Sequence, residues 1–108
     1  MADTDNRAFG NIATKLLMEN DRVRIWEMRL EPGQDSDVHR HDLDYVLVQI
    51  DGHRIAGVPE PDSRGEYNEH IEADVVPGNF VYVGRGGIEV ARNVGNKQYY
   101  EILIELKD

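Results

Sequence analysis

The residues best suited to chemistry are two histidines, His39 and His41, which stand two positions apart ahead of an apolar run. In an extended chain, side chains at positions i and i+2 point to the same face, so the two imidazoles can converge on one point. Neutral imidazole is a common metal ligand. The spacing therefore predicts two metal ligands on one face of a strand. An exposed pair at the edge of a loop is the alternative that the pair alone leaves open.

A longer pattern surrounds this pair. Spaced glycines bracket it in the order Gly33-x5-His39-x-His41-x3-Tyr45-x6-Gly52. The pattern resembles the first motif of the cupins, Gly-x5-His-x-His-x3-Glu-x6-Gly. It departs from that motif only at Tyr45, where the family usually has glutamate.

A second run of residues is similar to the second cupin motif, Gly-x5-Pro-x-Gly-x2-His-x3-Asn. It reads Gly78-x5-Gly84-Arg85-Gly86-x2-Glu89-x3-Asn93, so Gly84 replaces the proline and Glu89 replaces the usual histidine. On these two runs the chain is identified as a small single-domain cupin, of the cupin 2 type, with an altered metal motif. The resemblance implies an all-β fold, an antiparallel jelly-roll β-barrel.

The resemblance also implies a set of metal ligands. The usual cupin set is three histidines and one glutamate, whereas this chain offers His39, His41 and Glu89. Two histidines and one carboxylate with open positions are the arrangement associated with non-haem Fe(II) oxygenases. The expected cofactor is a divalent metal ion, either Fe, Mn, Ni or Zn. The expected function is binding of a small molecule beside that ion, with oxygenase- or lyase-type activity.

Tyr45 and Glu89 are also the candidate catalytic residues. Ionising a phenol of pKa about 10 at pH 7 costs about 4 kcal/mol, which makes Tyr45 a poor ligand for most divalent ions. Without a metal, a histidine beside Glu89 and the Tyr45 phenol could perform general acid–base chemistry of the isomerase or epimerase type. A third hypothesis is a non-catalytic binding protein whose metal site has degenerated.

Short extended segments separated by turns must position these residues. Pro-Gly, Asn-Asp, Asp-Gly and Gly-Asn dipeptides recur along the chain, and no convincing helix interrupts the pattern. Such spacing is typical of a β-sandwich or barrel of about eight or nine short strands. The expected strands are Thr14–Glu19, Val23–Leu30, Val38–Ile50, His53–Val58, Glu66–Val76, Phe80–Val83, Ile88–Val94 and Gln98–Leu106.

Several strand residues are candidates for lining the barrel. They are Trp26, Met28, Gln49, Tyr82 and Tyr100. In the last strand, Tyr100 shares one face with Ile102, Ile104 and Leu106. Arg24 and Arg92 could bind a substrate carboxylate at the barrel mouth, although charged residues in strands usually face outward.

Charge and composition narrow the choice of partners. The 108 residues include 21 acidic and 12 basic side chains, and a formal charge of −9 disfavours nucleic acid as a partner. No run approaches the about 20 apolar residues of a membrane span. The lack of cysteine favours a cytoplasmic protein. Residues 1–11 are expected to be mobile and residues 12–108 to form one barrel domain, whose exposed sheet edges favour a homodimer.

Overall fold

The structure is a computed structural model that describes residues 9–108, and every regular element in this part of the chain is a β-strand. Nine strands follow one another in chain order. They are β1 (Lys15–Glu19), β2 (Val23–Leu30), β3 (His39–Arg40), β4 (Asp44–Asp51), β5 (Arg54–Pro59), β6 (Ile71–Asp74), β7 (Phe80–Val83), β8 (Ile88–Asn93) and β9 (Tyr99–Leu106).

β9 lies at the centre of a five-stranded sheet with the order β1-β2-β9-β4-β7. Its sequence, YYEILIEL, is rich in the β-branched and aromatic residues that favour strands. β9 pairs antiparallel along its whole length with β2, from Val23 opposite Leu106 to Leu30 opposite Tyr99. On its other side it pairs antiparallel with β4. The central strand β9 therefore holds β2 and β4 in place on its two sides.

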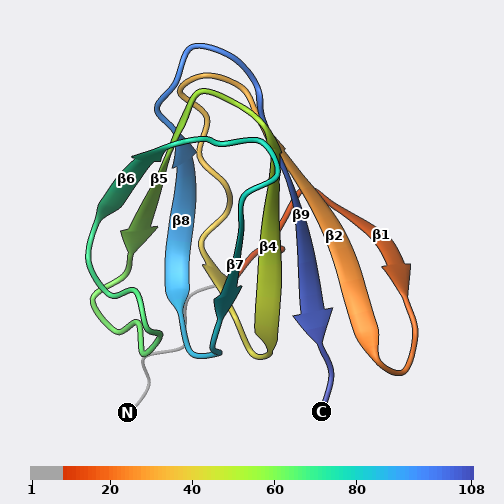
Figure 1. Ribbon diagram of the computed structural model, residues 1–108. Helices are drawn as coiled ribbons and strands as arrows, with labels where there is room; N and C mark the ends of the chain where they lie inside the picture. Colours follow the sequence, from red (N-terminus) through yellow and green to blue (C-terminus); the bar gives the residue numbers. More distant parts are fainter. Residues whose placement is uncertain (1–8) are drawn as a thin grey trace.

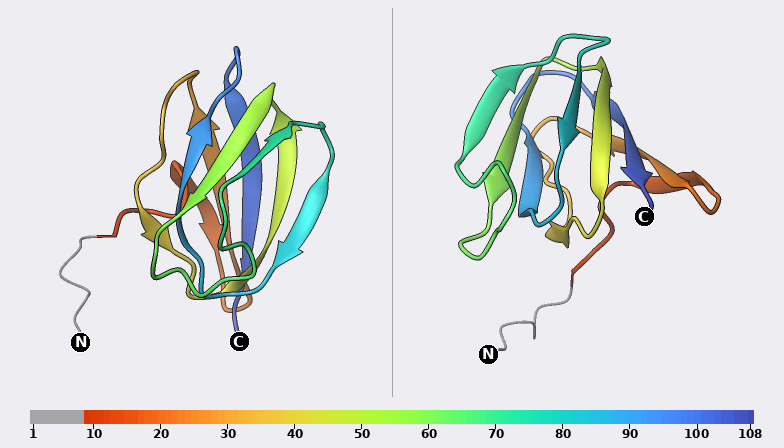
Figure 2. Two further views of the ribbon diagram at one scale, coloured as in Figure 1. Left: turned by 90° about the vertical axis from the view of Figure 1, so that its left-hand side faces the viewer. Right: turned by 60° about the horizontal axis from the view of Figure 1, so that its bottom comes forward.

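The second sheet has four strands in the order β3-β8-β5-β6, again antiparallel. Figures 1 and 2 show the two sheets facing each other, with β6, β5 and β8 on the left of Figure 1 and β4, β9, β2 and β1 toward the right. The prediction of an all-β, antiparallel jelly-roll barrel is confirmed.

The strand expected over Val38–Ile50 is two strands in the structure, and that prediction was wrong. β3 pairs with β8 in the four-stranded sheet, while β4 pairs with β7 and β9 in the five-stranded sheet. The chain changes sheets between them, and residues 41–43 belong to neither strand. Both parts are extended, and residue alternation alone does not report a change of sheet.

The strand expected over Glu66–Val76 is shorter than predicted and consists of β6 alone. The preceding residues form a loop that is bonded to the corner before β8. Glu66 Oε1 accepts a hydrogen bond from the Gly84 amide at 2.6 Å, and Ser63 Oγ accepts one from the Ile88 amide at 3.0 Å. These bonds direct the loop across the end of the barrel instead of along β5.

The core lies between the sheets and includes Met28, Leu30, Tyr99 and Leu103, each at most 3% exposed. In β9 the residues from Tyr99 onward alternate between buried and half-buried, with Tyr99, Glu101, Leu103 and Glu105 inside. The expectation that Tyr100 lines the barrel was therefore wrong. Tyr82 is also outside, 55% exposed, where its hydroxyl donates to Asp44 at 3.0 Å.

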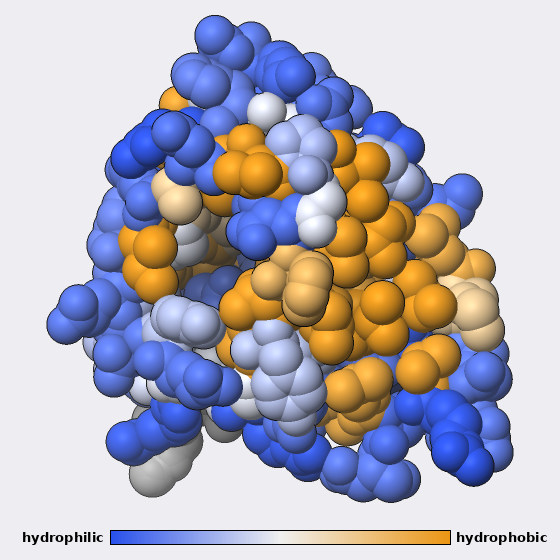
Figure 3. Space-filling model, viewed as in Figure 1, coloured by the Kyte–Doolittle hydropathy of each residue, from blue (hydrophilic) through white to orange (hydrophobic). Residues whose placement is uncertain are grey.

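Apolar side chains also cover the outer surface of the five-stranded sheet. Directly paired residues of antiparallel strands point to one side. On the outer side, Ile104 of β9 stands between Ile25 of β2 and Val46 of β4. Figure 3 shows a broad apolar area over these strands. We call it the outer apolar face, made of Ile25, Val46, Val48, Phe80, Tyr82, Ile102 and Ile104.

The segment expected to be mobile, residues 1–11, lies mostly outside the described residues. Of its described part, Gly10 donates a backbone hydrogen bond to the Val38 carbonyl at 2.9 Å. Within residues 9–108 no helix is long and apolar enough to cross a membrane.

Candidate metal centre

His39 and Glu89 are brought together by the pairing of β3 with β8, in which the two residues stand directly opposite each other. His41 lies just beyond β3, where its backbone amide donates to the Gly87 carbonyl at 2.8 Å and its carbonyl accepts from the Gly86 amide at 2.9 Å. Gly86 has φ of 111°, a conformation that side chains rarely tolerate. The glycine-rich corner before β8 therefore holds His41 beside the other two residues.

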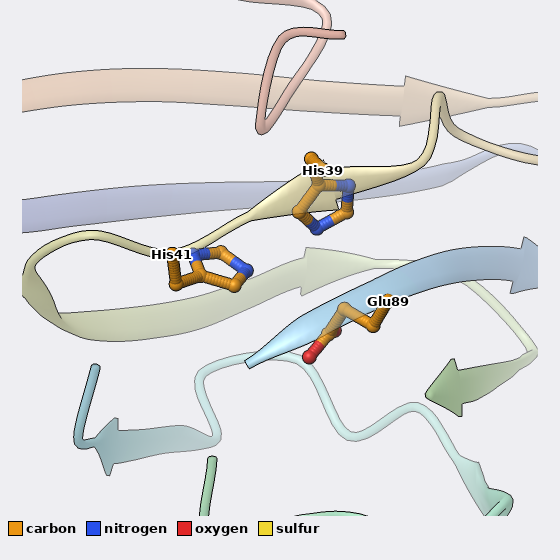
Figure 4. A group of neighbouring side chains, drawn as sticks. All are labelled: His39, His41 and Glu89. Atoms are coloured by element: carbon orange, nitrogen blue, oxygen red, sulfur yellow. The ribbon is translucent and has the colours of Figure 1, made fainter. Parts of the chain in front are cut away.

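The three side chains point into one space (Figure 4). One ligand atom from each of His39, His41 and Glu89 lies within 4.8 Å of the others. Ligands at neighbouring positions on one ion stand about 3–3.6 Å apart, because each metal–ligand bond is about 2.0–2.2 Å long. Closure by about 1–2 Å would bring these atoms to coordinating distance. The structure thus brings together the three residues that the sequence predicted as ligands.

His39 is oriented for binding through one nitrogen. Its Nδ1 lies 2.8 Å from the Asp37 carbonyl oxygen, which accepts a hydrogen bond and so assigns the proton to Nδ1. The lone pair is then on Nε2. Burial lowers the pKa of His39 below its usual value, so the ring is neutral near pH 7. A histidine whose far nitrogen is anchored by a backbone carbonyl is the common arrangement of metal-ligating histidines.

His41 is also neutral and it carries an unsatisfied atom. Burial and, to a smaller degree, the neighbouring His39 lower its pKa to about 3. Its Nδ1 is the one side-chain nitrogen or oxygen in the described chain that is fully buried without a hydrogen-bond partner. An orphaned buried polar atom is costly, so it indicates a site built for a group that supplies the partner.

Glu89 supplies the single carboxylate of the group. Burial raises its pKa above the usual value, because the ionised form loses water. A bound cation would favour the ionised form again. Two neutral imidazoles and one carboxylate match the donor types preferred by Fe, Mn, Ni and Zn, so the residues fit a divalent metal ion of this kind.

Tyr45 packs against this group without joining it. Its ring is stacked on that of His41, with centroids 4.2 Å apart and planes 23° apart. Burial, and then the charges of Glu89 and Glu101, raise the pKa of its phenol above the usual value. A phenol held in its neutral form is a poor ligand for a divalent ion. Tyr45 therefore packs its ring against His41 and lines the cavity with its hydroxyl in the neutral form.

A cavity of about 260 Å³ extends from these residues between the two sheets. The apolar part of its wall includes Leu47, Ile55, Val81 and Leu103. Its size depends on small residues of the four-stranded sheet. At Gly57 an added Cβ would meet no atom within 4 Å.

Glu101 is a functional candidate that the sequence did not reveal. It lies in the cavity wall, is 3% exposed, and accepts a hydrogen bond of 2.5 Å from the Tyr99 hydroxyl. Tyr99 in turn is bonded by the Gln49 side chain. Burial raises the pKa of Glu101 to about 7. Within β9 this glutamate stands between Tyr100 and Ile102, and no motif or spacing marks it.

The arginines proposed to bind a substrate carboxylate lie elsewhere. Arg92 pairs with Asp35 at 2.8 Å, and neither residue lines the cavity. Arg24 bonds Glu105 at 2.9 Å in a separate cavity of about 270 Å³, where Trp26 also donates to Glu105 at 2.8 Å. That role for the two arginines is therefore not supported by their positions. Met28 and Gln49 do line the main cavity, as predicted.

Comparison of the sequence with protein-family models and with curated proteins gives no match. Solved structures, in contrast, match closely in fold. A cupin domain from Bordetella pertussis Tohama I is 21% identical, with a TM-score of 0.73 over 87% of this chain and 91% of that one. An RmlC-like cupin family protein with a double-stranded β-helix fold, from Methanocaldococcus jannaschii, is 17% identical, with a TM-score of 0.70 over 99% of this chain and 87% of that one.

An oxalate oxidase in complex with the substrate analogue glycolate is also similar, at 20% identity and a TM-score of 0.61. The match covers 79% of this chain and 42% of the oxidase. The chain therefore has the cupin fold, the double-stranded β-helix, and the resemblance inferred from its two motifs is confirmed at the level of the fold. This fold includes enzymes of different reaction classes, so activity must be argued from the site.

Proposed function

We propose that the protein binds a small molecule in the cavity beside a divalent metal ion, either Fe, Mn, Ni or Zn, held by His39, His41 and Glu89. The proposed reaction class is oxygenase- or lyase-type chemistry. The observation that carries the proposal is the convergence of two buried, neutral imidazoles and one carboxylate, with a buried nitrogen of His41 left without a partner. Open positions on such an ion would serve the ligand.

The residues around the triad have defined tasks in this proposal. The ion, when bound, would supply Lewis acidity. The Asp37 carbonyl fixes the tautomer of His39, and the Tyr45 ring fixes the orientation of His41. The Tyr45 hydroxyl, kept protonated by burial, can donate a hydrogen bond to the bound molecule. Glu89 keeps the negative charge that a divalent ion requires.

Metal binding by untagged protein tests the proposal. The protein is stripped with a chelator and titrated separately with Fe(II), Mn(II), Ni(II) and Zn(II), and bound metal is measured by elemental analysis and calorimetry. We expect one ion per chain for at least one metal. Glu89→Gln should weaken that binding by about a hundredfold, because it removes the only charged ligand.

Glu69→Gln is the matched control, since Glu69 is an exposed glutamate at the same cavity. It removes the same charge and should leave metal affinity unchanged within about twofold. No uptake of any of the four metals by the wild-type protein would refute the metal proposal.

A metal-free acid–base enzyme is the second candidate, and one observation favours it. Glu101 has a pKa of about 7 and shares the cavity with Tyr45 and Glu89, so it can exchange protons near neutral pH. Under this hypothesis the protein takes up none of the four metals. A non-catalytic binding protein with a degenerate site also predicts no uptake, but it predicts no pH-dependent turnover of any bound ligand.

We also propose that two copies of the chain pair through the outer apolar face. Phe80 is 72% exposed there, and the half-buried Ile102 and Ile104 stand at its centre. Five strands spaced about 4.8 Å apart, three of eight residues, one of five and one of four at about 3.3 Å per residue, give a sheet face of about 500 Å². A standard interface buries about 800 Å² per partner. The face alone would therefore supply more than half of a standard interface with a second copy.

The remaining proposals concern location and partners. We keep the cytoplasm as the proposed location, because the 108-residue sequence holds no cysteine whose pairing would need oxidising conditions. The formal charge of −9 supports the proposal that the partner is a small molecule and neither a nucleic acid nor a membrane surface.

A further inference from the structure

The cavity has an unusual balance of charge for a ligand site. Its described lining includes three glutamates, Glu69, Glu89 and Glu101, and no lysine or arginine. Arg24 and Arg92 lie outside this lining and pair with Glu105 and Asp35, respectively. A bound anion would therefore face carboxylates with no protein cation in the wall to pair with it.

Only one of the two carboxylate oxygens of Glu101 has a hydrogen-bond partner in the protein. One of its oxygens, Oε1, accepts the hydrogen bond from Tyr99, and the Gln49 side chain bonds Tyr99 in turn. Its other oxygen, Oε2, makes no hydrogen bond within the described residues. Since His41 Nδ1 is the only fully enclosed side-chain atom there without a partner, Oε2 must remain accessible from the cavity space. A fixed carboxylate oxygen thus faces the cavity and lacks a donor.

We propose that Glu101 is a ligand-binding residue, and that the cavity takes a small, mainly apolar molecule carrying a cationic nitrogen, such as an alkylammonium group. This inference specifies the ligand of the proposed function and rests on it, because both use the same cavity. The N–H donors of the ligand bind Glu101 Oε2 in a charge-assisted hydrogen bond. Its hydrocarbon part packs against Leu47, Val81 and Leu103.

The rest of the cavity suits the same ligand. The aromatic rings of Tyr45 and Tyr99 line it, and aromatic faces attract cations. An ion held by the triad would offset the charge of Glu89, whereas the charge of Glu101 would remain for the ligand. Glu101 lies on β9 of the five-stranded sheet, whereas His39 and Glu89 lie on β3 and β8 of the other, so the two sheets supply the proposed ligand contact and the proposed metal ligands from opposite walls of one cavity.

Binding of three matched probes to chelator-treated protein tests the inference. The probes are pentylamine, pentan-1-ol and butanoate, which have equal numbers of non-hydrogen atoms. Calorimetry at pH 8 measures their affinities. We expect the amine to bind at least about tenfold more tightly than the alcohol, because of one charge-assisted hydrogen bond, and butanoate to bind most weakly. Equal affinity for amine and alcohol, or tighter binding of butanoate, would overturn the inference.

Two variants assign the preference to Glu101. Glu101→Gln keeps the shape of the side chain and an acceptor for Tyr99, and should remove the preference for pentylamine over pentan-1-ol. The control Glu72→Gln, at an exposed glutamate outside the cavity, should keep that preference within about twofold. Retention of the full amine preference in Glu101→Gln would show that another group binds the nitrogen and would contradict the proposal.

If Glu101→Gln does not fold, a measurement on the wild-type protein can replace the experiment with that variant. With ¹³C-labelled glutamate, the carboxyl resonance of Glu101 should shift when pentylamine is added and should not shift with pentan-1-ol. An unchanged Glu101 resonance at saturating amine would refute the assignment. Since all probe experiments use metal-free protein, failure of metal uptake leaves their result intact, and the two proposals can fail separately.

Discussion

The two faces of β9 differ in a way that reverses the usual pattern of a half-buried strand. The face toward the cavity carries Tyr99, Glu101, Leu103 and Glu105, so two carboxylates are buried at 3% and 2% exposure. The face away from it carries Tyr100, Ile102, Ile104 and Leu106, all half-buried. An isolated antiparallel sheet normally places its apolar face inside and its polar face in water.

The reversal separates two tasks on one strand. Buried carboxylates cost free energy, and each here has a specific donor: Tyr99 for Glu101, and Arg24 with Trp26 for Glu105. A buried carboxylate that keeps a free oxygen, as Glu101 does, can act on a bound molecule, whereas Glu105 is satisfied by its protein partners. The apolar outer face, in turn, is suited to burial against another molecule. Substitutions on the outer face of β9 are therefore predicted to change dimer formation. Substitutions on its inner face are predicted to change the stability of the protein and its pH dependence.

The largest effect is expected on the outer face. Ile104→Glu would place a charge at the centre of the proposed dimer interface, and the two-fold symmetry of a homodimer would apply it twice. We expect the dissociation constant of the dimer to rise by about a thousandfold or more, measured by analytical ultracentrifugation.

Val76→Glu is the control for that experiment. Val76 is 57% exposed and lies outside the outer apolar face, so the same added charge should leave the dimer intact. A wild-type protein that is monomeric at high concentration, or an Ile104→Glu variant that still pairs, would contradict the proposed interface.

A smaller effect is expected from Glu101→Gln on stability. Burial raises the pKa of Glu101 from 4.5 to about 7, so the folded protein holds a proton that the unfolded chain releases between these values. Stability from this group is present at low pH and is lost as pH rises toward 7. The shift corresponds to about 3 kcal/mol. The glutamine variant should gain about that much relative to wild type between pH 4.5 and pH 8.

Denaturant unfolding at several pH values measures this gain. Glu69→Gln, at an exposed site, should differ from wild type by no more than about 0.5 kcal/mol at each pH. A stability difference between Glu101→Gln and wild type that does not change with pH would show that Glu101 is ionised over the whole range, and would contradict the raised pKa.

The smallest effect compares neighbouring tyrosines on opposite faces. Tyr99→Phe removes the hydrogen bond to Glu101 and should cost about 1–2 kcal/mol at pH 8, where the carboxylate is ionised. Tyr100→Phe loses only a long contact of 3.5 Å to Glu27 and keeps the ring beneath Arg29, so it should cost less than about 0.5 kcal/mol. Equal costs in denaturant unfolding would remove the distinction between the two faces.

Much of the fold could be predicted from local signals. Turn dipeptides and strand-forming residues gave most strand positions, because each depends on nearby sequence. The grouping of His39, His41 and Glu89 was also predictable, since two spaced motifs place them on paired strands. The division of Val38–Ile50 could not be predicted, because it depends on which sheet each half joins. That depends on pairing with strands that are distant in the sequence.

The inner face of β9 was hidden for a similar reason. A strand that reads YYEILIEL predicts burial of its isoleucines, and with them of Tyr100 on the same face. The actual orientation depends on register. Glu101 stands opposite Met28 of β2 and Gln49 of β4, and both of those side chains line the cavity. No single strand contains this information, so Glu101 could be found only in the assembled barrel.

Gly57 is a position at which a single mutation could change the length of the cavity. It faces the ligand space from β5, has ordinary strand geometry, and leaves room for a side chain. A mutation there can shorten the longest molecule that fits without disturbing the triad, Glu101 or either sheet. Descendants of this chain could therefore change their preferred ligand length one carbon at a time, while keeping the triad and Glu101 in place.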